Sequence, residues 1–332
     1  MTCAYLAFTE KGLALANRLA AALPGSVARC GHGGPSLTSW TAEQFARTDA
    51  LIFVGAVGIA VRAISPHCRS KASDPAVVVV DECGRFAVPV LSGHLGGANA
   101  LAQRLAAVCG AVPVITTATD ANGLFAVDSW AVRQGCTVLE TARIKRVSAK
   151  LLAGQPVTFW SAFPIAGPLP EGIVPAPAQE AADFALTLTP AGQALHLIPH
   201  IGVLGIGCRR GTTAEQLETA FAGFCAAHGL APQGITAAAS IDLKQKEPGL
   251  LAFCQSHGWP VSFSSAGQLQ TAPGCFTPSP FVQSVTGVDN VCERAAVLAS
   301  GGTLIFPKQA GGGVTFALAA RPYAPDWRWQ DV

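Results

Sequence analysis

The sequence is poor in charged residues and lacks the patterns that mark several classes of protein. Only 13% of its 332 residues are charged, and the formal net charge is +2. Proteins that bind nucleic acid usually gather basic residues on one face, so this balance gives no indication of such a partner. The longest apolar run, 50–61, ends at Arg62 and is shorter than the roughly 20 residues that span a membrane. The first residues also lack the charged start and apolar stretch of a signal peptide.

Cysteine is present, but without the spacing that metal sites and disulfide frameworks need. The eleven cysteines are odd in number, include no CxxC pair and mostly lie in apolar runs. Closely spaced cysteine pairs are typical of zinc sites, and an even number of cysteines is typical of the disulfide framework of a small secreted protein. We therefore expect reduced, buried cysteines in a cytoplasmic protein that has no membrane association and no metal site of its own.

Apolar residues make up half of the sequence and fall into strand-like and helix-like segments. Fully apolar runs such as 51–54 and 77–80 are typical of strands buried on both faces of a parallel sheet. Helical spacing of apolar residues is found at 12–23 and again across 95–108. A second block of alternating strands and helices starts near residue 201. There Thr212 or Thr213 is expected to cap a helix, with Glu215 or Gln216 as its capping-box partner.

These two blocks predict an α/β protein with two open, mainly parallel α/β domains joined by a small irregular middle segment. We place the N-terminal domain at 1–134, the middle segment at 135–199 and the C-terminal domain at 200–332. The proline-rich stretch at 163–179 is the reason for expecting an irregular connector.

Polar and flexible residues gather in SGHLGGAN at 92–99, between a predicted strand and a predicted helix. The carboxyl ends of parallel strands form the edge where α/β sheets bind ligands, and a helix start offers free N–H groups to an anion. His94 can change its charge near neutral pH. The other candidate binding residues of this stretch are Ser92, Gly93, Gly96, Gly97 and Asn99. The simpler alternative is that Ser92 only caps the helix and the glycines only form a tight turn.

Three neighbouring segments are expected to reach the same edge of the sheet. GAVGIAVR follows one predicted strand, TTATD follows another, and KASD precedes the strand at 77–80. Alternatively, the acidic residue of TTATD is a helix cap and the cations of the other two segments are solvated surface charges. The candidate residues of these segments are Gly58, Arg62, Lys71, Thr116, Thr117 and Asp120.

The second block carries a further set of candidates at strand ends. GIGCRRG at 205–211 resembles the dinucleotide motif GxGxxG, but its third glycine comes one residue late. An anion-binding loop with an arginine pair is the better interpretation. SIDLKQKE at 240–247 and a lysine at 308 follow two other predicted strands. The candidates of this block are Gly205, Gly207, Arg209, Arg210, Ser240, Lys244, Glu247 and Lys308.

Several long motifs, taken in order, resemble a known family. GAVGIAVRAISP, DPAVVVVDECG, LSGHLGGANALA and TTATD are similar to the N-terminal part of the CbiG family, the cobalt-precorrin-5A hydrolases of anaerobic cobalamin synthesis. GIGCRRGTT, ASIDLKQKEPGL and SVTGVDNVCERAA resemble the C-terminal domain of that family, which is also similar to the stand-alone protein CobE. The resemblance covers most of 50–130 and 200–318.

The resemblance implies a hydrolase that opens the δ-lactone on ring A of cobalt-precorrin-5A and releases acetaldehyde, giving cobalt-precorrin-5B. It also implies a tetrapyrrole substrate that brings its own cobalt, so no protein cofactor is expected. The carboxylates of such a substrate suit the cations and helix starts described above. Contact with other enzymes of the pathway is a further expectation.

A mechanism follows as a hypothesis. His94 would act as the general base, the N–H groups of Gly96 and Gly97 would hold the oxyanion, and Asp120 or Lys244 would protonate the ring. The C-terminal cations would clamp carboxylates across a cleft between the domains. Two alternatives stay open: a non-catalytic tetrapyrrole carrier or chaperone, and a nucleotide-binding oxidoreductase.

Overall fold

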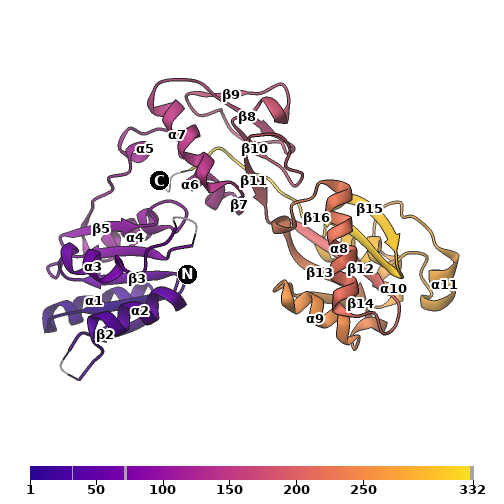
Figure 1. The fold of residues 1–332 in the computed structure, drawn as a ribbon, viewed down its shortest axis with the longest axis horizontal. Coiled ribbons are helices and arrows are strands. Elements are labelled where there is room, and N and C mark those ends of the chain that lie inside the picture. Colours follow the sequence, from indigo (N-terminus) through magenta and orange to yellow (C-terminus); the bar gives the residue numbers. More distant parts are fainter. Residues whose placement is uncertain (32, 71–72, 330–332) are drawn as a thin grey trace.

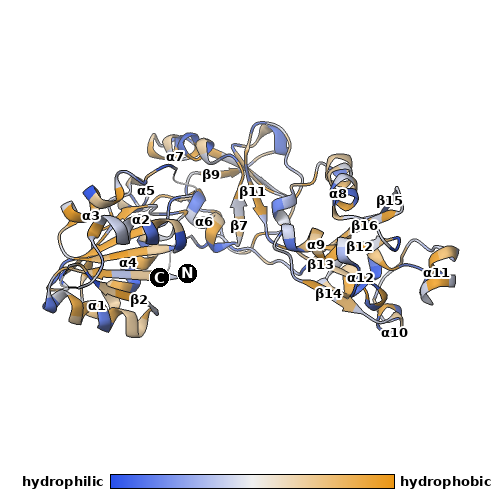
Figure 2. Cartoon of the chain, turned by 60° about the horizontal axis from the view of Figure 1, so that its bottom comes forward, coloured by the Kyte–Doolittle hydropathy of each residue, from blue (hydrophilic) through white to orange (hydrophobic). Residues whose placement is uncertain are grey.

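A computed structural model describes residues 1–31, 33–70 and 73–329, which form three sheets along the chain (Figure 1). The N-terminal and C-terminal sheets lie at opposite ends of the molecule, and the middle sheet lies between them (Figures 1 and 2). The prediction of an α/β protein with mainly parallel sheets is confirmed. Among the described residues, no helix is both long and apolar enough to cross a membrane.

The N-terminal domain is a six-stranded sheet in the order β2-β1-β3-β4-β5-β6, with helices on both faces. Its strands are β1 (Cys3–Ala7), β2 (Gly25–Arg29), β3 (Ala50–Val54), β4 (Ala76–Val80), β5 (Phe86–Leu91) and β6 (Val112–Pro113). Its helices are α1 (Glu10–Ala22), α2 (Leu37–Arg47), α3 (Val57–Ile64) and α4 (Ala98–Cys109).

The fully apolar strands of this domain are explained by the two helix layers. Successive side chains of a strand point to opposite faces. Ile52 and Val78 pack under α1 and α4, whereas Phe53 and Val79 pack under α2 and α3. Because both faces are covered, both sets of side chains must be apolar.

Strand β5 is antiparallel to β4, and this direction corrects the expectation that all the candidate segments share one edge of the sheet. Strands β1, β3 and β4 are parallel, but β5 pairs antiparallel with β4, so that Leu91 lies opposite Val77. The end of β5 therefore lies at the edge where β4 begins. The segments that follow β3 and β5 lie at opposite edges, not on one rim as the sequence suggested. The short turn at 81–85 permits this direction, because two antiparallel strands can be joined by a hairpin, whereas parallel strands need a longer crossover.

The middle region is a regular sheet, where an irregular segment was expected, and it starts before residue 135 because Val127 and Trp130 pack into its core. Five strands pair in the order β7-β11-β10-β8-β9, and part of the proline-rich stretch forms its edge strand β9. Proline is tolerated on edge strands because they need fewer backbone donors. The elements are α5 (Ala118–Ala121), α6 (Val127–Arg133), β7 (Cys136–Val138), α7 (Ile144–Leu152), β8 (Val157–Ser161), β9 (Ile173–Pro175), β10 (Phe184–Leu186) and β11 (Leu195–Pro199).

The C-terminal domain has a five-stranded sheet in the order β14-β13-β12-β16-β15, also covered on both faces. Thr213 caps α8 and forms the expected capping box with Gln216. The strands are β12 (Gly202–Cys208), β13 (Ile235–Ile241), β14 (Val261–Ser264), β15 (Thr303–Gly311) and β16 (Val314–Ala320). The helices are α8 (Ala214–His228), α9 (Pro248–Ser256), α10 (Ala266–Gln270), α11 (Pro280–Thr286) and α12 (Cys292–Ser300).

Candidate active site

The imidazole of His94 lies between two carboxylates that come from different segments. Its Nε2 is 2.7 Å from Asp120 Oδ2, at the end of the TTATD segment. Its Nδ1 is 3.2 Å from Asp128 Oδ2, in the first turn of α6. The three side chains are only 13%, 19% and 12% exposed, respectively. The expected meeting of His94 and Asp120 is confirmed, and it arises because β5 and β6 are parallel and end at the same edge.

The two carboxylates determine the charge of His94. Burial by itself lowers the pKa of an imidazole, but the hydrogen bonds and charges of Asp120 and Asp128 outweigh it and raise the pKa of His94 to about 9. His94 is therefore an imidazolium at neutral pH. A protonated ring with both nitrogens engaged is poorly suited to be the general base that the sequence suggested.

Asp120 Oδ2 accepts hydrogen bonds from three side chains. It accepts hydrogen bonds from His94 and from Asn99 Nδ2, at 2.8 Å, and a short one from Thr117 Oγ1. Burial raises the pKa of Asp120, but these donors together lower it below its ordinary value. All three donors contact the same oxygen. In the described part of the chain no hydrogen bond reaches Oδ1, which leaves that oxygen for a ligand.

A cavity of about 400 Å³ opens beside these groups. It lies where the loop after β5, the start of the middle region and the last described residues meet. A cavity of this size accommodates part of a large ligand, such as one ring with its substituents. The lining residues include Gly93, His94, Asn99, Asp120, Arg133 and Trp329.

The start of α4 is not the anion site that the glycines suggested. The N–H groups of Gly97, Ala98 and Asn99 donate to the carbonyls of His94, Ser92 and Gly93, respectively. The loop thus folds back and satisfies the free donors of the helix itself. The proposed oxyanion role of Gly97 is wrong because its N–H already has an acceptor.

The other residues of this loop are explained by packing. Ser92 has a positive φ of 56°, and its hydroxyl donates to the carbonyl of Asp74 at 2.9 Å. A Cβ on Gly96 would lie 2.4 Å from the Cβ of Ser92, and one on Gly93 would lie 2.8 Å from Asn99 Oδ1. Gly93 and Gly96 are thus needed for the tight turn, although Gly93 also lines the cavity.

Two further candidates lie away from this edge, and one lies outside the described residues. Gly58 and Arg62 are exposed on α3, which follows β3 at the opposite edge of the sheet. Thr116 is exposed and does not line the cavity. Lys71 lies outside the described residues.

Three candidates in the C-terminal domain have structural roles, which corrects their assignment to substrate binding. A Cβ on Gly205 would lie 1.8 Å from the carbonyl oxygen of Cys292, and one on Gly207 would lie 2.3 Å from Thr315 Oγ1. Both glycines belong to β12 and allow α12 and β16 to pack closely, so they do not form a phosphate-binding loop. Ser240 is fully buried and donates to the carbonyl of Ile206 at 2.7 Å.

The charged candidates of this domain are not brought to His94. Arg209 and Arg210 are exposed after β12. Lys244 forms an ion pair with Glu247 at 3.2 Å, and Glu247 also accepts from the N–H of Gly211 at 2.6 Å. All four belong to the domain at the other end of the molecule, so the expected clamp across a cleft is not formed (Figure 1).

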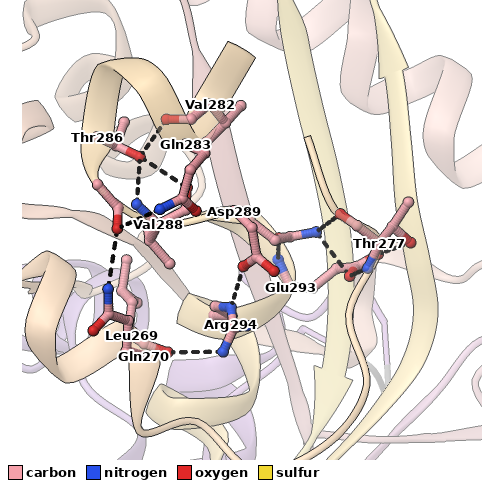
Figure 3. A network of polar contacts seen from close by, with 12 residues as sticks. Leu269, Gln270, Thr277, Val282, Gln283, Thr286, Val288, Asp289, Glu293 and Arg294 are labelled. Atoms are coloured by element: carbon pink, nitrogen blue, oxygen red, sulfur yellow. Dashed lines mark hydrogen bonds and ion pairs between the residues drawn. The ribbon is translucent and has the colours of Figure 1, made fainter. Parts of the chain in front are cut away.

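Lys308 belongs to a network centred on a buried glutamate. Its N–H donates to Glu293 Oε1 at 2.7 Å, and its Nζ donates to the carbonyl of Thr277 at 3.2 Å. Glu293 is fully buried and also accepts from the backbone and hydroxyl of Thr277 (Figure 3). This network ties β15 to the segment before α11.

Sequence reasoning missed two residues of the site. Asp128 reaches His94 from the middle region, and Trp329 reaches the cavity from the end of the chain. Asp128 stands among mainly apolar residues and Trp329 stands in the stretch DWRWQD, so neither belongs to a motif that indicates ligand binding. In the described residues, no group of three or more His, Cys, Asp or Glu side chains has the arrangement of a metal site.

The chain matches three family models in sequence order. They are "Cobalamin synthesis G N-terminal" at 39–120, "Cobalamin biosynthesis central region" at 125–196 and "Cobalamin synthesis G C-terminus" at 202–319. The chain is also 36% identical to the "Cobalt-precorrin-5A hydrolase" of Salmonella typhimurium, over 95% of this chain and 96% of that protein. The chain belongs to the CbiG family.

Other relatives support this membership. The "Cobalt-precorrin-5A hydrolase" of Priestia megaterium is 32% identical over 84% of this chain and 80% of that protein. "Protein CobE" of Sinorhizobium sp is 36% identical over 35% of this chain and 78% of its own length. The central model spans the region in which the sequence motifs gave no indication of a family, so this CbiG chain has a recognisable middle region as well.

Proposed function

We propose that this chain is a cobalt-precorrin-5A hydrolase that opens the ring A δ-lactone and releases acetaldehyde, giving cobalt-precorrin-5B. Two relatives that match most of this chain carry the name of that activity. The His94 imidazolium, which lies between Asp120 and Asp128 at the wall of a cavity, is the observation that supports placing this reaction there. A buried cation beside a carboxylate with one available oxygen supplies both an electrophile and a base.

The general base of this proposal is Asp120, and not His94 as expected from the sequence. Asp120 Oδ1 accepts the proton of the water that attacks the lactone carbonyl, since it is an acceptor beside the cavity. The His94 cation stabilises the negative charge that develops on the lactone oxygens. Asp128 holds the imidazole at Nδ1, as the aspartate of other acid–base triads does.

The proton transfers of the proposed reaction balance. Collapse of the tetrahedral intermediate leaves a carboxylic acid and an alkoxide, and the alkoxide expels acetaldehyde by breaking the carbon–carbon bond. The electron pair of that bond goes to the macrocycle. Asp120 then delivers to the ring the proton that it took from water, and His94 stays protonated between its two carboxylates. The product carboxylic acid loses its proton to solvent.

In this proposal the substrate brings its own cobalt, and the protein contributes no cofactor. The reaction takes place in the cytoplasm, which the scattered, unpaired cysteines favour. Contacts with other enzymes of cobalamin synthesis remain a prediction.

The test is to incubate the purified chain with cobalt-precorrin-5A and to measure acetaldehyde. Release at many turnovers per enzyme, coupled to loss of the lactone, is the expected result. Asp120→Asn should lose this activity, whereas Asp242→Asn, which replaces a carboxylate of the C-terminal domain, should retain it. Binding of the tetrapyrrole without acetaldehyde release would contradict the proposal and favour the carrier or chaperone.

A further inference from the structure

The last described residues of the chain return to the middle region. We call residues 321–329 the C-terminal strap. Figure 1 shows this yellow segment leaving the C-terminal sheet and running along the middle sheet toward α6. Trp130 Nε1 donates to the carbonyl of Asp326 at 2.6 Å, and the N–H of Asp326 donates to Gln134 Oε1 at 3.1 Å. The hydroxyl of Tyr323 donates to the carbonyl of Gln134 at 2.9 Å.

The strap is anchored by an aromatic cluster. Trp327 is buried and stacks on Trp130, with ring centroids 5.0 Å apart and planes 16° from parallel. The ring of Phe159 makes a T-shaped contact with Trp327, with centroids 4.7 Å apart. Burying indole rings in this way stabilises the contact by the apolar area that leaves water and by the favourable ring geometry. The strap is therefore a fixed part of the middle region.

Helix α6 connects the strap to the active site. One side of the helix presents Trp130 to the strap, and Asp128 at its start holds His94. Ser129 and Arg133, which are one helical turn apart, line the cavity. The strap thus fixes the element that positions the imidazolium.

Trp329 continues from this anchor into the cavity wall. It lines the cavity together with His94 and Arg133, and its ring makes a T-shaped contact with that of Phe125, with centroids 5.5 Å apart and planes at 71°. Phe125 is buried, so the indole is supported from behind. The indole thus forms part of the cavity wall beside the charged groups of the site.

We propose that Trp329 is a specificity-determining residue that contacts the apolar face of a pyrrole-type ring and holds it beside His94 and Asp120. This inference rests on the function proposed above. A tetrapyrrole combines flat apolar rings with carboxylates, and aromatic side chains bind such faces by stacking. The contact is made to substrate and transition state alike, so its loss raises KM more than it lowers kcat.

Three variants test the proposal in the full chain. Trp329→Ala should raise KM for cobalt-precorrin-5A, and the Kd measured by absorbance titration, about tenfold, with kcat changed less than threefold. Trp329→Phe should restore most of the affinity because it keeps an aromatic face. Arg328→Ala, on the adjacent exposed residue of the strap, is the matched control and should behave as the wild type. An unchanged KM and Kd in a folded Trp329→Ala protein would overturn the proposal.

A second measurement does not depend on the folding of the alanine variant. Binding of cobalt-precorrin-5A should quench the fluorescence of Trp329, and Trp329→Phe should lose that part of the quenching. Equal quenching per tryptophan in the two proteins would overturn the proposal. If the wild type binds the tetrapyrrole but releases no acetaldehyde, the proposed function fails, and the Kd and quenching results still decide the role of Trp329.

Discussion

His94 is held by carboxylates on both ring nitrogens, and this arrangement gives the residue its proposed role. Two negative charges within hydrogen-bonding distance favour the protonated ring more than burial disfavours it. The cation in turn keeps Asp120 ionised, which the lowered pKa of Asp120 reflects. An electrophile and a base are thus maintained side by side at neutral pH. The sequence could identify His94 and Asp120 as candidates, but not their charge states, because those depend on Asp128.

Replacing His94 should lower kcat much more than it weakens binding of the tetrapyrrole. His94→Ala is expected to lower kcat about 10²- to 10³-fold, the range for loss of one preorganised group that stabilises developing negative charge, with a smaller change in Kd for cobalt-precorrin-5A. Acetaldehyde release and absorbance titration measure the two quantities. His257→Ala is a suitable control, since His257 also pairs with a carboxylate, that of Glu218, but lies in the C-terminal domain. Near-normal acetaldehyde release by His94→Ala would remove His94 from the mechanism.

The raised pKa of His94 also predicts how stability depends on pH. Its pKa is about 9 in the folded chain and near 6.5 when unfolded, so its pairing stabilises the fold fully below pH 6.5. This contribution, on the order of 3 kcal/mol, is lost as the pH rises through about 9. Urea unfolding of the wild type and of His94→Gln at pH 6 and pH 10 measures the difference. If the unfolding free energies of the two proteins decrease by the same amount between pH 6 and pH 10, His94 is not a buried cation.

At the scale of elements, the direction of β5 decides which segments meet. Because β5 opposes β4 and is parallel to β6, the loops after β5 and β6 share an edge with the start of β4. The apolar runs predicted the strands and the two helix layers well, since both follow from local spacing. Strand direction depends on pairing between distant segments, and therefore Gly58 and Arg62 were wrongly placed on the same rim as His94.

The turn at the start of α4 offers a test at this scale. Gly97 caps the helix with a φ of 81°, so Gly97→Ala should cost about 1–2 kcal/mol in unfolding free energy. Gly110, at the other end of α4, has a φ of 75° and open space around it, so Gly110→Ala should cost a similar amount. Only Gly97→Ala should also lower kcat, because it shifts the loop that carries His94. Equal kcat values in the two variants would show that catalysis does not depend on the exact position of the loop that carries His94.

At the scale of the whole molecule, the C-terminal strap joins parts that are far apart in the sequence. The middle region contributes Asp128, and the last described residues contribute Trp329, to a site whose motifs lie in the N-terminal domain. Sequence motifs indicated the N-terminal share of the site because its residues are clustered. The other two contributions are single residues, Asp128 among mainly apolar neighbours and Trp329 in the stretch DWRWQD, and a single residue forms no local pattern that indicates a site.

The C-terminal domain lies far from the His94 cavity, and this separation can be tested. Arg209 is exposed in the domain at the far end from His94, so a substrate in the His94 cavity should not reach it (Figure 1). We therefore expect Arg209→Ala to change KM for cobalt-precorrin-5A less than twofold, both at low salt and at 0.5 M salt, whereas Trp329→Ala raises it. Steady-state acetaldehyde assays measure both values. A large, salt-sensitive increase of KM in Arg209→Ala would show instead that the domains close over the substrate, because a charge can act on the ligand only from within about a Debye length.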